Sequence, residues 1–124
     1  MIPKLIPAIL MFLTLLAHVI GGAIDVHSPL YEAAGTPALM AYTSIIWHMI
    51  SFTIFMFFLA LLWIAYYPNR PTALLLSITQ IGYAILFITY GITHLGNIWE
   101  MPQWSIFILI PALTMWNIKK TPFA

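Results

Sequence analysis

Four histidines are the side chains of this sequence best suited to chemistry, namely His18, His27, His48 and His94. Neutral imidazole is the commonest metal ligand in proteins, and its pKa lies close to physiological pH. His18 and His48 each lie within a long apolar segment, where an ionisable side chain usually has a function. We therefore predict a binding site centred on these two residues.

Three histidines and one carboxylate make up the predicted metal site: His18, His48, His94 and Asp25. Donors of these types bind zinc, copper or iron. His18 and His48 are also a candidate pair of axial ligands for haem b. No H-x-x-x-H or E-x-x-H spacing is present, so no local motif selects among these cofactors.

The alternative interpretation is that the histidines hold helices together. A buried imidazole bonded to a hydroxyl or a backbone carbonyl needs no ion, and such bonds contribute about 0.6–2 kcal/mol in membranes. His27 and His94 lie near the ends of apolar segments, where solvation by water is the simpler interpretation. For His18 and His48 the sequence leaves both interpretations open.

The composition indicates that lipid is the solvent of this chain. Of its 124 residues 63% are hydrophobic and 6% are charged, whereas a soluble domain carries about 25% charged residues. A net charge of +1 excludes a nucleic-acid partner, and the absence of cysteine excludes disulfides and thiolate metal sites. No local arrangement for nucleophilic catalysis or phosphate binding is present, which argues against an enzyme.

Four apolar segments are long enough, or nearly so, to cross about 30 Å of hydrocarbon as helices. They predict an all-α, integral membrane four-helix bundle that forms a single domain over residues 1–124. The expected spans cover residues 5–24, 38–67, 72–95 and 103–118. Asp25 and Pro29 are expected to open a loop that runs to Pro37.

The first span also resembles a signal peptide, because Lys4 precedes an apolar run that ends at Gly21, Gly22 and Ala23. The run is about 20 residues long, whereas a signal core has roughly 7–15. We therefore interpret it as a retained span.

The charged residues predict the orientation of the bundle. In a four-span chain all basic residues fall on one side and all acids on the other: Lys4, Arg70, Lys119 and Lys120 against Asp25, Glu32 and Glu100. Because basic loops stay in the cytoplasm, both termini are predicted to be cytoplasmic. This orientation places His18 about 10 Å and His48 about 15 Å below the outer surface, at 1.5 Å per residue.

Polar residues recur at helical spacing along the second and third spans. They are Ser44, His48 and Ser51 in the second, and Gln80, Tyr83, Phe87, Tyr90 and His94 in the third. An unpaired polar group in hydrocarbon costs several kcal/mol, so these stripes are expected to face the bundle interior.

Three short motifs carry a resemblance to a group of small bacterial four-span membrane proteins. They are Leu15-Leu16-Ala17-His18, Ile46-Trp47-His48-Met49-Ile50-Ser51 and Pro102-Gln103-Trp104. The resemblance implies a bacterial cytoplasmic (inner) membrane, and it draws attention to His18 and His48. It implies no activity.

Two classes of function therefore stand open. The first is a membrane protein that binds a metal ion or haem through histidines in the outer half of the bilayer. The second is a structural or accessory subunit that packs against its own copies or a larger membrane complex. A small-solute transporter is less favoured, because the small multidrug transporters of similar length carry a glutamate inside the first span and no span here contains Asp or Glu.

Overall fold

The computed structural model describes residues 2–119, and over this range the chain forms helices and no strands. The elements are α1 (Ile2–Leu16), a π-helix η1 (Ala17–His27), α2 (Ser28–Ala33), α3 (Pro37–Tyr66), α4 (Arg70–Leu95) and α5 (Gln103–Lys119). The all-α prediction is confirmed. Within the described chain, three helical segments are long and apolar enough to cross a membrane: Pro3–Ala33, Pro37–Tyr66 and Arg70–Leu95. At 17 residues, α5 is about 25 Å long.

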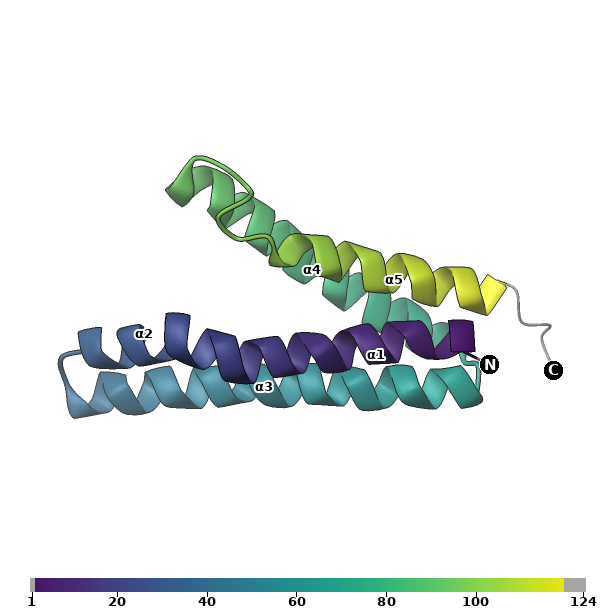
Figure 1. Ribbon diagram of the computed structural model, residues 1–124, viewed down its shortest axis with the longest axis horizontal. Coiled ribbons are helices and arrows are strands. Elements are labelled where there is room, and N and C mark those ends of the chain that lie inside the picture. Colours follow the sequence, from purple (N-terminus) through teal and green to yellow (C-terminus); the bar gives the residue numbers. More distant parts are fainter. Residues whose placement is uncertain (1, 120–124) are drawn as a thin grey trace.

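The helices form two antiparallel hairpins that diverge from each other (Figure 1). One hairpin pairs the continuous α1, η1 and α2 with α3, and the other pairs α4 with α5. The two hairpins meet where α1 begins and separate toward the opposite end. The main buried cluster lies at this junction and includes Met11 and Ile110, both fully buried. No residue of η1 or α2 is buried, so on this hairpin the buried side chains are confined to the half near the junction.

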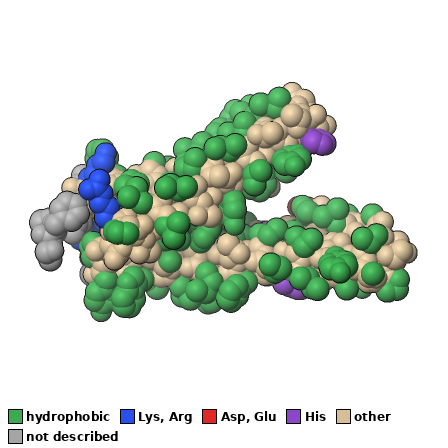
Figure 2. Space-filling view, turned by 180° about the vertical axis from the view of Figure 1, so that it is seen from behind, with side chains coloured by type: hydrophobic (Ala, Val, Ile, Leu, Met, Phe, Trp, Pro, Cys, Tyr) green, Lys and Arg blue, Asp and Glu red, His purple; other side chains and the backbone are tan. Residues whose placement is uncertain are grey.

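Charges separate to the two ends of the molecule. Lys4 near the start of α1, Arg70 at the start of α4 and Lys119 at the end of α5 lie at the junction of the hairpins, which we call the basic end (Figures 1 and 2). The acids lie in η1, in α2 and after α4, at the opposite, acidic end: Asp25, Glu32 and Glu100. Lys120 lies outside the described residues.

The expected loop over residues 25–37 is wrong for most of its length. The first helix continues to Ala33, and residues 34–36 alone connect it to α3. Pro29 does not stop the helix, because it lies in the first turn of α2, where no N–H donor is required. The Ala23 carbonyl accepts both the Ser28 N–H and, at 2.9 Å, the Ser28 hydroxyl directly before the proline.

Side-chain caps fix where α3 and α4 begin. The Thr36 hydroxyl accepts a hydrogen bond from the Leu39 N–H at 3.3 Å, and the Asn69 carboxamide oxygen accepts one from the Thr72 N–H at 2.9 Å. Each cap is followed by a proline in the first turn. Gly96, with φ of 76°, ends α4 in the left-handed conformation that side-chain-bearing residues avoid. The two hairpin turns and the break after α4 are therefore set by local sequence.

One hydrogen bond ties the start of α1 to the end of α5. Pro7 lies inside α1 and has no N–H, so the carbonyl of Pro3, four residues earlier, lacks its normal helical donor. The Asn117 carboxamide donates to this carbonyl at 3.0 Å. The bond joins the two hairpins at the basic end.

We predict that Asn117→Leu lowers the free energy of unfolding by about 0.6 kcal/mol, the average for side-chain hydrogen bonds in membrane bundles. The loss should shrink in a Pro7→Ala background, because alanine supplies the N–H that the Pro3 carbonyl lacks. A double-mutant cycle, measured by denaturant unfolding in detergent, checks the coupling. Equal losses in both backgrounds would contradict it.

Candidate functional site

The π-helix η1 brings His18 and His27 to one face of the first helical segment. In a π-helix each backbone bond reaches back five residues, so a turn holds more residues than in an α-helix. His27 follows His18 by nine residues, which is two and a half turns of α-helix but about two turns of π-helix. Gly22 lies between them on the same face. In an α-helix the two imidazoles would point in opposite directions.

Trp47 of α3 packs between these two histidines. The imidazole of His18 stacks on its indole with ring centroids 4.0 Å apart and an interplanar angle of 18°. The ring of His27 lies 5.3 Å from the same indole at 29°. Gly22 allows this contact, since a Cβ atom there would lie 2.8 Å from Cη2 of Trp47. The indole is therefore held against the backbone of η1 by a ring on each side.

His48 completes the group next to His27. Their ring centroids are 6.0 Å apart at an angle of 50°. Nε2 of His27 also lies 3.4 Å from the hydroxyl of Ser44, a long and weak hydrogen bond. We call His18, Trp47, His27 and His48 the Trp47 stack. It gathers three of the four histidines on the hairpin of α1–α2 and α3.

His18 and His48, the two residues at the centre of the predicted site, differ in their burial. His18 is half-buried, and its Nε2 atom is shielded from solvent with no hydrogen-bond partner among residues 2–119. His48 is exposed, on the rim of an open surface hollow that Ser44, Met49 and Phe52 also line. The expectation that both imidazoles face the bundle interior is therefore not met at His48. The opening of the hollow is on the outer surface of α3.

The predicted ligand set of His18, His48, His94 and Asp25 is not brought together. His94 lies at the far end of α4, on the other hairpin, where it is exposed and its Nδ1 lies 2.8 Å from the Thr93 hydroxyl. Asp25 is exposed on η1. Within residues 2–119, no three His, Asp or Glu side chains lie close enough together to hold a metal ion. The cause is the divergence of the hairpins, which carries the end of α4 away from η1 (Figure 1).

The polar stripe of α4 faces the interior over only part of its length. Gln80 is fully buried, and Tyr83 and Phe87 are half-buried against Phe107 of α5. Further along the stripe, Tyr90 and His94 are exposed. The prediction that this stripe faces the interior is therefore correct near the junction and wrong where the hairpins have separated.

Sequence reasoning missed Trp47 as a member of the site, and it weighed His27 as an outer ligand but preferred to interpret it as a solvated residue. Trp47 directly precedes His48, and an aromatic residue at mid-span was a signal that the site includes more than histidines. His27 was assigned to a loop because Asp25 and Pro29 resemble a turn. One further signal pointed to His27: Gly22 follows His18 by four residues and His27 follows Gly22 by five. This spacing places the three residues on one face only in a π-helix.

We predict that Gly22→Ala lowers the free energy of unfolding by about 1–3 kcal/mol, the range for overpacking a close contact. The indole cannot easily move aside, because His18 and His27 contact it. Gly21→Ala is the matched control, since nothing lies within 4 Å of a Cβ atom there. Thermal unfolding in detergent measures both, and equal stability of the two variants would show that Trp47 does not rest on Gly22.

Comparisons with known proteins add no assignment to this geometry. No protein-family model matches the chain, and neither a curated protein nor a solved structure does. The resemblance to small bacterial four-span membrane proteins stays a prediction. The site is therefore judged on its own residues.

Proposed function

We propose that this protein binds a transition-metal ion through His27 and His48 of the Trp47 stack. The observation that carries the proposal is the 6.0 Å separation of their ring centroids. Two imidazoles that share one ion have centroids about 5–6 Å apart, because each nitrogen–metal bond is about 2 Å long. The weak contact between His27 and Ser44 leaves the imidazole of His27 available to exchange its partner for an ion.

Copper is the ion that the surrounding side chains favour. Imidazole suits both zinc and copper, whereas a thioether selects copper(I). Met49 lines the same surface hollow as His48 and brings a thioether into it. A structural zinc site needs four protein ligands, more than this hairpin offers among the described residues.

Haem b fits this pair less well than a bare ion. Axial ligation by His27 and His48 requires a flat slot between them for the macrocycle. The ring of His27 is already packed by Trp47 at 5.3 Å and by Tyr31 at 6.1 Å. His18, the other predicted haem ligand, lies on the far side of the Trp47 indole, against which it stacks.

The test is metal analysis of the purified chain after loading with copper(I) and, separately, with zinc. We predict stoichiometric copper, and we expect His27→Ala and His48→Ala each to weaken binding by more than about 10–100-fold, the effect of removing even an indirect metal partner. His94→Ala is the matched control and should retain copper, because it lies on the other hairpin.

The opposite result favours a structural or accessory subunit. His48 is exposed in the middle of a 30-residue apolar helix, and a polar group facing hydrocarbon is costly unless another helix covers it. Under this alternative the purified chain holds neither copper nor zinc, and His48→Ala changes the assembly mass in detergent. Metal-free protein with unchanged assembly would contradict both functions.

We also propose four spans with both termini in the cytoplasm of a bacterial inner membrane. The segregation of charge supports this orientation, since basic residues favour the cytoplasmic side. As a fourth span, α5 would cross slightly thinner hydrocarbon than the other helices, which flanking Lys119 and Trp104 accommodate.

The cysteine-free sequence makes this topology directly testable. We predict that Glu32→Cys reacts with a membrane-impermeant maleimide in intact cells and that Arg70→Cys reacts only after lysis. Both residues are exposed, so differences in labelling report the membrane and not burial. Labelling of Arg70→Cys in intact cells would overturn the proposed orientation.

A further inference from the structure

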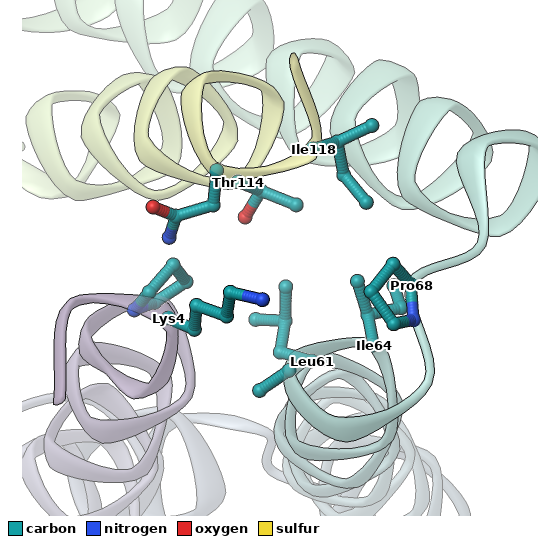
Figure 3. Close-up of a pocket in the computed structure, with 9 residues that line it drawn as sticks. Lys4, Leu61, Ile64, Pro68, Thr114 and Ile118 are labelled. Carbon is teal, nitrogen blue, oxygen red and sulfur yellow. The ribbon is translucent and has the colours of Figure 1, made fainter. Parts of the chain in front are cut away.

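The second hairpin is held at its base and stands apart from the first along its outer half. At the basic end, Thr114 and Ile118 project from α5 toward Leu61 and Ile64 of α3 (Figure 3). Ile64 and Ile118 are buried there in one cluster. Beyond the junction a notch separates the hairpins, and the end of α4 lies across it from η1 and α2 (Figures 1 and 2). Residues 83–110, which we call the outer segment, are therefore attached at one end only.

Both helices of the second hairpin have a weak point at the base of the outer segment. Helix α5 contains Pro111, and α4 contains Gly82, where nothing lies within 4 Å of the position of a Cβ atom. The ring of Phe107 contacts those of Tyr83 and Phe87, with centroids 5.6 and 6.0 Å apart. Because α4 and α5 are antiparallel, one turn further along α5 corresponds to one turn earlier in α4, and Pro111 is level with Gly82. Helices kink at proline, and glycine leaves the facing helix flexible at the same level.

Unpaired polar groups lie at this level of the junction. Pro111 has no N–H, so the carbonyl of Phe107 lacks its normal helical donor. Gln80 of α4 is fully buried, and neither polar atom of its carboxamide has a hydrogen-bond partner among the described residues. A carboxamide N–H and a free carbonyl are a matching donor and acceptor. The same combination is already paired near the start of α1, where Asn117 donates to the carbonyl that Pro7 leaves free.

We propose that the outer segment bends at Gly82 and Pro111 and closes against η1. In the closed state the Gln80 carboxamide donates to the Phe107 carbonyl, and this hydrogen bond holds the bend. Closure also covers η1, no residue of which is buried in the open structure. In hydrocarbon, contact between helices adds packing, and an internal hydrogen bond has no competitor from water.

The bend that this movement requires is of ordinary size. From Gly82 to Leu95 helix α4 is about 20 Å long, so a bend of about 20°, the lower limit of a sharp helix kink, moves its end by about 7 Å. The buried side chains of Ala84 and Phe107 lie within about one turn of the hinge and move by about 2 Å at most. The junction therefore stays packed while the notch narrows.

Spin labels on the cysteine-free chain test the movement by double electron–electron resonance in lipid vesicles. Ile24→Cys in η1 and Leu95→Cys at the end of α4 carry the labels, and both positions are exposed. We expect two distances that differ by about 7 Å, the displacement that a bend of about 20° produces. The pair Ile24→Cys and Leu39→Cys is the matched control, because both positions lie on the first hairpin, and it should give one distance.

Variants at the hinge decide whether Pro111 and Gln80 control the movement. Pro111→Ala supplies the N–H that the Phe107 carbonyl lacks, so the shorter distance should be lost. Gln80→Leu should reduce the population with the shorter distance about threefold, the factor that corresponds to an average side-chain hydrogen bond in membrane bundles. Ser77→Ala is the matched control, because its hydroxyl is also buried without a partner among the described residues but lies one turn of α4 away from Gln80.

Three outcomes would overturn the proposal. A single distance between the labels at positions 24 and 95, with Pro111 and Gln80 unchanged, would show that the outer segment does not move. Two distances that neither Pro111→Ala nor Gln80→Leu alters would place the hinge elsewhere. Equal losses for Gln80→Leu and Ser77→Ala would show that no specific hydrogen bond holds the closed state. If Pro111→Ala fails to fold, Gln80→Leu against Ser77→Ala still decides.

Discussion

Hydrocarbon offers no hydrogen bonds, and this constraint governs most of the structure. Every backbone N–H and C=O in such a solvent must find its partner inside the protein. The chain meets this demand by being almost continuously helical from Ile2 to Lys119, with its breaks at residues 34–36, 67–69 and 96–102. Even the defect made by Pro7 is repaired, since Asn117 reaches across from α5 to the carbonyl that the proline leaves without a donor.

The same constraint explains what the sequence could and could not predict about the fold. Length and hydropathy identify the helices, and the N-cap residues Thr36 and Asn69 mark where α3 and α4 begin. The prediction of a loop after Asp25 was wrong, because Pro29 is compatible with the first turn of a helix and does not end the helical segment. The angle between hairpins was beyond prediction, because it depends on how the buried side chains at the junction pack.

The grouping of residues in the Trp47 stack could not be predicted, because the sequence was interpreted with the period of an α-helix. Histidines within apolar segments were recognisable from their type and position alone. With 3.6 residues per turn, however, His18 and His27 lie on opposite faces, and any argument from that period separates them. The π-helix changes the register, and the aromatic ring that fills the space between the imidazoles comes from another helix. Local π-helical turns occur frequently at functional sites, which agrees with the chemistry proposed here.

The interior near the junction contains buried polar groups that lower the stability of the protein. Gln80 is fully buried, and neither polar atom of its carboxamide has a hydrogen-bond partner among the described residues; the same holds for the hydroxyl of Ser77 one turn earlier. Such groups destabilise a dry interior by roughly 1–3 kcal/mol each. The surrounding contacts of Met11, Ala84 and Ile110 must offset this. Packing at the junction therefore has to be tight.

The divergence of the hairpins makes that tight junction a pivot. Helix α4 runs about 16 Å from Ala84 of the buried cluster to its end at Leu95, so a rotation of about 5° at the cluster would move that end by about 1.4 Å. Figure 2 shows the resulting notch between the two arms. Its width is governed by side-chain volumes at Met11 and Ile110, far from the residues that border it. A substitution that changes the volume of either buried side chain would therefore alter the separation of the two arms.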